Sequence, residues 1–226
     1  MQGTLFPDII LCRTLESIVK LLRADLMEHG NNDTETILYK IIGEDEEHKA
    51  LKWNFVNFYK QAKKIILDEN NMSVNFGYNL EVSTPICMHI ILPSEQGRMC
   101  IGADEGYVGE RDDEGNIQLY HTEMYETTYQ IMITGTNSTE VTIVYHIIKS
   151  MLLMLVDQID LMGIRNPSFS GNDIVMQDDL TPVPIFHRVL NISFTYEHNV
   201  PKLTKEMVAK NFYYQYRLVD NETESE

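Results

Sequence analysis

An acidic segment between residues 101 and 126 contains the residue types that most directly suggest chemistry. It holds eight acids and a single base, Arg111. The acids are Asp104, Glu105, Glu110, Asp112, Asp113, Glu114, Glu123 and Glu126. Runs of this kind bind calcium when the ligands alternate and a bidentate glutamate closes the loop, and this run has neither feature. We therefore expect a solvated loop or hairpin, and keep as an alternative a metal-dependent hydrolase that uses the 104–114 loop.

The stretch TGTNSTE, residues 134–140, is a second candidate because it reads as a turn between a strand and a helix. A phosphate-binding loop needs several glycines to free its backbone N–H groups and a lysine to reach the outer phosphates. This turn has one glycine and no lysine, and Glu140 at the helix start would repel a phosphate. The pattern favours a tight turn in which Asn137 or Ser138 caps the helix.

The remaining constellations have simpler structural interpretations. Residues 47–49, with Asp33 upstream, match the E-x-K fragment of one nuclease class, but we expect them at the acidic start of a helix. The seven histidines form no HxxxH pair, and His89 and His146 are expected to be half-buried packing residues. The three cysteines lack CxxC spacing, which predicts reduced thiols. The sequence therefore predicts no enzyme, no cofactor and no metal site.

The charge of the chain argues against a nucleic-acid-binding protein. Its 34 acids and 18 bases give a formal charge of -16, the opposite of the basic surface that displaces counterions from DNA or RNA. No stretch approaches the roughly 18 consecutive apolar residues of a membrane span, and the first residues lack the order of a signal peptide. We expect a soluble, intracellular product with no membrane partner.

Hydrophobic periodicity predicts the main helices and strands. Apolar residues at spacings of three and four predict helices over 8–29, 45–67 and 138–162. Alternating apolar and polar residues predict strands over 72–80, 127–134 and 190–197. Apolar runs are interpreted as further short strands over 37–42 and 85–92.

Turn-forming residues separate the later elements. Residues 166–173 and 178–184 are rich in Pro, Gly, Asn and Asp, and are expected to be turns that flank a short edge element. Pro201 is expected to end the last strand. The order of elements is not a series of βαβ units, so the predicted fold class is α+β, a mainly antiparallel sheet with helices packed on one face. Residues 1–200 are predicted to form a single domain, and 201–226 an arm with an acidic tip.

The stretch from residue 127 to 174, leading into PIFHRVLNISFTYEHNVP, carries a family resemblance. Its strand, long helix, G-x-x-N and S-G-x-D turns and final F-x-Y-E strand resemble the tail-completion, or tail-terminator, and neck proteins of tailed bacteriophages. The resemblance covers roughly residues 8–200 and is strongest over 127–200. The richness in Asn, Met, Tyr and acids also resembles virion proteins of the crAss-like phages.

The resemblance implies a tail-terminator-like fold and a structural virion protein of the head–tail junction, made in the host cytoplasm. Six or twelve copies would form a ring beside portal, neck and tail proteins, and DNA would pass through it without specific binding. The channel would be lined by the acids at 44–47 or by those of the 101–126 segment, namely Asp104, Glu105, Glu110, Asp112, Asp113 and Glu114. Contacts between subunits, or a fold back onto the same subunit, are expected from Phe212, Tyr213, Tyr214 and Tyr216. A further alternative is a small cytoplasmic adaptor that docks through this C-terminal arm.

Overall fold

The computed structural model of the chain describes residues 5–29, 32–42, 55–77, 84–98, 107–111, 117–174 and 185–201. The chain divides into two compact units. The larger unit comprises Phe6–Gly97 and Tyr125–Tyr196. The smaller unit comprises Met1–Leu5, Arg98–Met124 and Glu197–Glu226.

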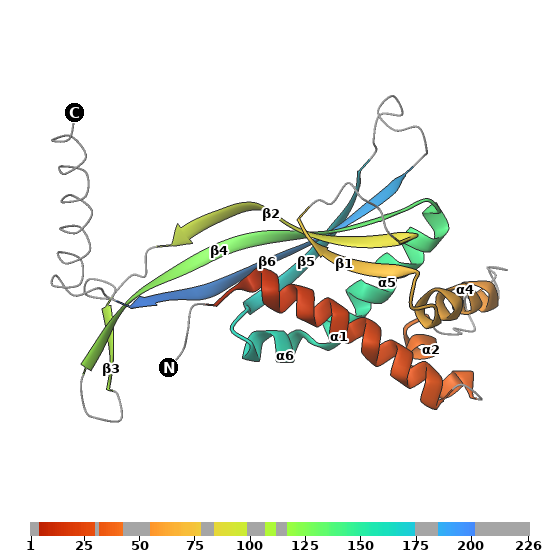
Figure 1. The fold of residues 1–226 in the computed structure, drawn as a ribbon, viewed down its shortest axis with the longest axis horizontal. Helices are drawn as coiled ribbons and strands as arrows, with labels where there is room; N and C mark the ends of the chain where they lie inside the picture. The colour runs from red at the N-terminus through yellow and green to blue at the C-terminus, as the bar shows by residue number, and fades with distance from the viewer. Residues whose placement is uncertain are drawn as a thin grey trace, which may run out of the picture. The chain divides into compact units, whose positions relative to one another are not determined.

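The described strands form one mixed sheet (Figure 1). They are β1 (Met72–Phe76), β2 (Ile86–Arg98), β3 (Tyr107–Arg111), β4 (Ile117–Gly135), β5 (Arg165–Ile174) and β6 (Phe186–Pro201). Their order is β1-β2-β4-β6-β5, and β3 pairs with β4. The β1–β2 pair is parallel, whereas β3–β4 and β5–β6 are antiparallel.

The two central pairings are antiparallel as well. The Thr134 hydroxyl on β4 donates to the carbonyl of Cys87 on β2, and the Thr127 hydroxyl donates to the carbonyl of Ser94. Residue numbers therefore rise along β2 as they fall along β4, which is the antiparallel pattern. The Thr128 hydroxyl lies 2.8 Å from that of Ser193, and Thr122 pairs with Asn199, so β4 and β6 run antiparallel too. The predicted fold class, α+β with a mainly antiparallel sheet, is confirmed.

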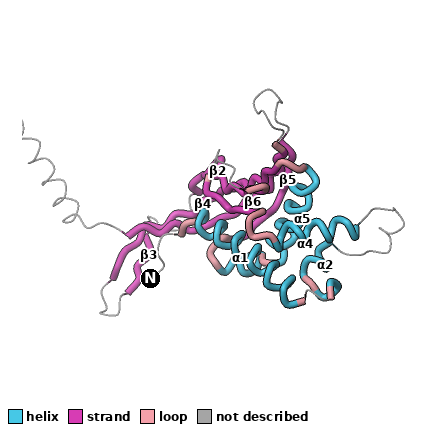
Figure 2. Tube along the Cα trace, turned by 45° about the vertical axis from the view of Figure 1, so that its right-hand side comes forward, coloured by secondary structure: helices cyan, strands magenta, loops and turns pink. Residues whose placement is uncertain are grey.

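The helices of the larger unit lie on one face of its sheet (Figures 1 and 2). They are α1 (Pro7–Glu28), η1 (Asp33–Glu35), α2 (Ile37–Ile42), α4 (Phe55–Leu67), α5 (Ser138–Met154) and α6 (Val156–Leu161). The predicted periodicity of α1 is confirmed, since the residues that it places on one face are buried. These are Leu11, Leu15, Ile18, Leu22 and Leu26. Pro7 opens the helix, where its missing N–H is not needed.

The core forms where this helical layer meets β4 and β6. The alternating residues of β4 and β6 that the sequence placed on one face are buried: Tyr129, Ile131, Ile133, Leu190, Ile192, Phe194 and Tyr196. The rings of Tyr129 and Phe194 stack with centroids 5.6 Å apart. The Tyr129 hydroxyl donates to Asp8 at 3.0 Å and so ties α1 to the sheet.

The prediction of a strand over residues 37–42 is wrong, because this segment is helix α2. The N–H of Ile37 donates to Oδ2 of Asp25 at 2.7 Å, and the N–H of Tyr39 donates to the Thr36 hydroxyl at 3.1 Å. These oxygens satisfy N–H groups that are left without partners at a helix start. Asp25 belongs to α1, so half of this cap is a tertiary contact. The apolar run alone does not distinguish a buried strand from a short helix.

Other boundaries also differ from the predictions. Residues 166–173 are not a turn but most of strand β5, the last strand at one side of the sheet. Pro167 is tolerated there because it lies at a register shift between Arg165 and Ser168 in an edge strand. Strand β4 begins at Ile117, ten residues before the predicted start, since the pairing of β3 with β4 extends it. The third helix is broken at Leu155, between α5 and α6.

Candidate functional site

The turn between β4 and α5 is capped as the sequence predicted, and Asn137 is the capping residue. Its Oδ1 accepts hydrogen bonds from the backbone N–H groups of Thr139 at 3.0 Å and Glu140 at 3.5 Å. Those N–H groups are therefore occupied by the protein's own side chain. Gly135 serves close packing, since a Cβ there would lie 2.9 Å from Cγ2 of Val141 and 3.1 Å from the carbonyl oxygen of Pro85.

The acidic segment is in part a hairpin, as predicted. Glu110 on β3 lies opposite Gln118 on β4, and Arg111 lies opposite Ile117. The backbone of Glu110 is described, whereas the other proposed channel residues, Asp104, Glu105, Asp112, Asp113 and Glu114, lie outside the described residues. The acids at 44–47, the E-x-K fragment at 47–49 and the arm residues Phe212, Tyr213, Tyr214 and Tyr216 also lie outside them. In the smaller unit, the Thr122 hydroxyl donates to Oδ1 of Asn199 at 2.7 Å.

Cys87 and His89 are buried residues of β2 that lie beside polar groups of β1 and β4. The hydroxyls of Ser73 and Thr84 are 2.8 Å apart, and the Ser73 hydroxyl also contacts the Cys87 sulfur at 3.4 Å. Cys87 and Cys12 are both buried free thiols. His89 is 2% exposed, and its Nδ1 lies 3.3 Å from the carbonyl oxygen of Gly77. Burial lowers the pKa of His89, against the raising effect of that hydrogen bond, so the ring is neutral at pH 7.

His187 on β6 is a buried residue that no sequence motif indicated. It is 7% exposed, and neither ring nitrogen has a hydrogen-bond partner among the described residues. Burial lowers the pKa of His187, and protonation of His89 would lower it further. Both histidine rings are therefore neutral in the folded chain at pH 7.

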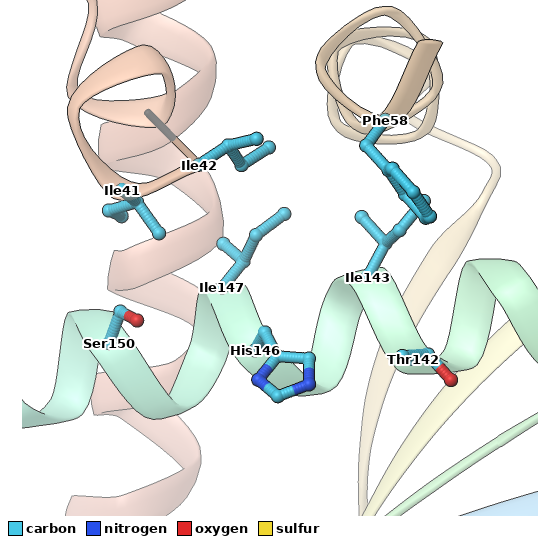
Figure 3. Close-up of a pocket in the computed structure, with 8 residues that line it drawn as sticks. All are labelled: Ile41, Ile42, Phe58, Thr142, Ile143, His146, Ile147 and Ser150. Carbon is cyan, nitrogen blue, oxygen red and sulfur yellow. The ribbon is translucent and has the colours of Figure 1, made fainter. Parts of the chain in front are cut away.

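An apolar pocket of about 380 Å³ lies between α2, α4 and α5 of the larger unit. Figure 3 shows the residues that line it, which are Ile41, Ile42, Phe58, Thr142, Ile143, His146, Ile147 and Ser150. The lining comes from α2 and α4 and from α5, which is about seventy residues further along the sequence. The sequence prediction missed the pocket because it interpreted residues 37–42 as a strand. One of the three helices that line the pocket, α2, was therefore not predicted.

Two basic residues, Lys149 and Arg188, lie near His146 at the polar side of this pocket. His146 is exposed rather than half-buried as predicted, yet partial desolvation lowers its pKa, and the charges of Arg188 and Lys149 lower it further. The Arg188 guanidinium lies 5.2 Å from the centre of the Tyr145 ring, and the Lys149 ammonium lies 6.0 Å from it. Arg188 also donates to both carboxylate oxygens of Asp173, at 2.6 and 3.1 Å. The site is thus suited to an apolar group accompanied by a negative charge.

Comparison with known proteins identifies no family for this chain. No protein-family model matches the chain, and no curated protein matches it either. Within the described parts of the chain, no group of three or more His, Cys, Asp and Glu residues is arranged to hold a metal ion. None of the helices described is long and apolar enough to cross a membrane.

Proposed function

We propose that this chain is a structural virion protein that assembles into a ring at the head–tail junction of a tailed bacteriophage. The ring contains six or twelve copies and contacts portal, neck and tail proteins. DNA passes through it without specific binding. The chain is made in the host cytoplasm and has a tail-terminator-like fold.

The observation that carries the proposal is the difference between the two sides of the sheet. One side ends at β1, which is parallel to its neighbour. The other ends at β5, which is antiparallel to its neighbour and has a register shift between Arg165 and Ser168. Copies that meet side by side therefore join unlike surfaces. Such a heterologous contact closes a ring when its rotation is a simple fraction of a full turn.

The charge of the chain supports the passage of DNA. The formal charge is -16, and the segment around the β3–β4 hairpin, which includes Glu110, contributes many of the acids. A wall of carboxylates repels DNA phosphates and gains nothing from counterion release, so DNA slides past it without adhering.

The experiment that tests the proposal is mass photometry of the purified protein, alone and mixed with candidate portal and neck proteins, followed by negative-stain imaging. Closed rings are the expected result of heterologous closure, and about six or twelve copies are the ring orders that the family resemblance implies. A monomer in every mixture would refute the ring. A monomer that binds one partner, and loses it when residues 202–226 are deleted, would instead favour the adaptor. Thermal stabilisation by calcium, magnesium or manganese would favour the hydrolase.

A further inference from the structure

The ends of α5 and α6 present an unusual set of exposed apolar side chains. Within residues 153–162 the exposed fractions are 51% for Leu153, 58% for Met154, 86% for Leu161 and 50% for Met162. We refer to these four residues as the apolar knob. Single exposed leucines are ordinary on protein surfaces, but four large apolar side chains within ten residues are typical of a contact site.

The knob is accompanied by negative charge. Residues 153–162 contain Asp157 and Asp160 and no base. Both aspartates are exposed, and Oδ1 of Asp160 accepts a hydrogen bond from the backbone N–H of Asn166 at 3.3 Å. Asp157 and Leu161 are four residues apart on α6, so they share one face of the helix.

The α2–α4–α5 pocket has the complementary character. Its lining is mainly aliphatic and aromatic, and its volume is about 380 Å³. Cavities of about 150 Å³ already admit a molecule the size of benzene, so this one has room for a leucine side chain and part of a neighbour. Lys149 and Arg188 lie near His146 at its polar side. Arg188 is paired with Asp173, so Lys149 supplies the positive charge at this side. The apolar character and the charge of the knob are thus complementary to those of the pocket.

The knob and the pocket are different surfaces of the larger unit, although both include residues of α5. The knob lies beside β5, since α6 packs against that strand. The pocket is lined by α2, α4 and residues 142–150 of α5. The helices α2 and α4 pack against α1, which in turn packs against β1. A contact between the knob and the pocket therefore joins unlike surfaces of two copies, as a closed ring requires.

We propose that the apolar knob of one copy inserts Leu161 into the α2–α4–α5 pocket of the next copy, with Asp157 facing the Lys149 side of that pocket. This inference rests on the proposed ring and names the contact that builds it. The occupant is a second copy of this chain. A portal or neck protein in the same pocket is an outcome that the test separates.

The first test compares Leu161→Asp with the matched control Leu21→Asp, in which an exposed leucine of α1, 44% accessible, receives the same charge. Because Leu161 is 86% exposed, its replacement leaves the core of the subunit intact, and circular dichroism checks this. We expect Leu161→Asp to raise the protein concentration needed for ring assembly at least about tenfold. The control should assemble like the unmodified chain. Equal loss in both variants, or in neither, would overturn the inference.

The second test detects the contact without relying on ring closure. Leu161→Cys and Ser150→Cys proteins are mixed under mild oxidation, and disulfide-linked dimers are measured on a non-reducing gel. All proteins in this test also carry Cys100→Ser, so that this native thiol does not contribute. A disulfide requires Cα atoms within about 7 Å, so it forms only when the knob reaches the pocket. We expect dimers in this mixture and only background in a mixture of Leu21→Cys with Ser150→Cys.

The two tests separate the contact from the function. Rings in the unmodified protein without the specific cross-link leave the ring standing and refute the knob contact. A specific cross-link in a protein that never forms rings, even with portal and neck proteins, supports the contact and refutes the ring. Efficient cross-linking of Leu161→Cys with itself indicates a two-fold contact and overturns the inference. Loss of portal binding in Leu161→Asp, with no cross-link between copies, assigns the knob to the portal and also overturns it.

Discussion

Substitution of Gly171 tests how tightly Tyr145 is packed, because one added methyl group at this position collides with Tyr145. A Cβ at position 171 would lie 2.8 Å from Cζ of Tyr145 and closer still to its hydroxyl oxygen. Tyr145 is only 7% exposed, and its ring lies edge-on to His146 with centroids 5.2 Å apart. Since Arg188 lies over the same ring, Tyr145 cannot move without disturbing both neighbours. Replacement of Gly171 by alanine should therefore strain the junction of β5 with α5.

The expected magnitude follows from the cost of overpacking. Extra methyl groups forced into a packed site typically cost about 1–3 kcal/mol of the free energy of unfolding. For a chain of this size each kcal/mol shifts the melting temperature by about 2–4 °C. We expect Gly171→Ala to lower the melting temperature by about 2–12 °C, as measured by calorimetry or by circular dichroism.

A double-mutant cycle identifies the collision as the cause. In a Tyr145→Leu background the ring is gone, so Gly171→Ala should cost less than about 0.5 kcal/mol, and the two substitutions should be coupled. Two results would contradict this explanation: Gly171→Ala melts at the same temperature as the unmodified protein, or it lowers the free energy of unfolding equally in both backgrounds. Either result would show that the collision is not what requires glycine at this position.

Three further predictions concern pH, helix capping and DNA. Burial lowers the folded-state pKa of His89 and His187, so their contribution to stability is complete above the unfolded pKa of about 6.5 and is lost as the pH falls below it. Thermal unfolding at pH 8 and pH 5 should show this loss, and His187→Leu should reduce it, whereas an unchanged difference would contradict the assignment. Asn137→Ala should lower the free energy of unfolding by about 0.5–2 kcal/mol in urea titrations, while Asn137→Asp, which keeps the acceptor, should lose less. The protein should not retard duplex DNA at low salt, where electrostatic binding is strongest, and a stable complex there would contradict the repulsive channel.

The long periodic elements could be predicted from the sequence. Leu11, Leu15 and Ile18 repeat at helical spacing in α1, and Leu190 and Ile192 alternate in β6, so in each case one face had to be buried. The cap at Asn137 was one of two predicted, because a side-chain oxygen before a helix satisfies its first N–H groups wherever the helix packs. The predicted fold class followed from the order of such elements.

The short elements could not be predicted in this way, because their partners are distant in the sequence. Residues 37–42 are helical in part because Asp25 of α1 caps them, and residues 166–173 form a strand along β6 although their composition is typical of turns. Sequence alone cannot place such partners, since a six-residue apolar run or a Gly-Asn pair is compatible with several backbone conformations.

The candidate site also has features that could be predicted from the sequence and features that could not. Its acidic hairpin was visible in the composition, since eight carboxylates in 26 residues form a feature of the sequence itself. The pocket of α2, α4 and α5 and the unpartnered ring of His187 exist only once the helices and strands have packed. Local periodicity and capping depend on neighbours within a few residues, so the sequence by itself determined the long helices, the alternating strands and the charge. A concave surface depends on side chains brought together over more than a hundred residues, which only the tertiary structure decided.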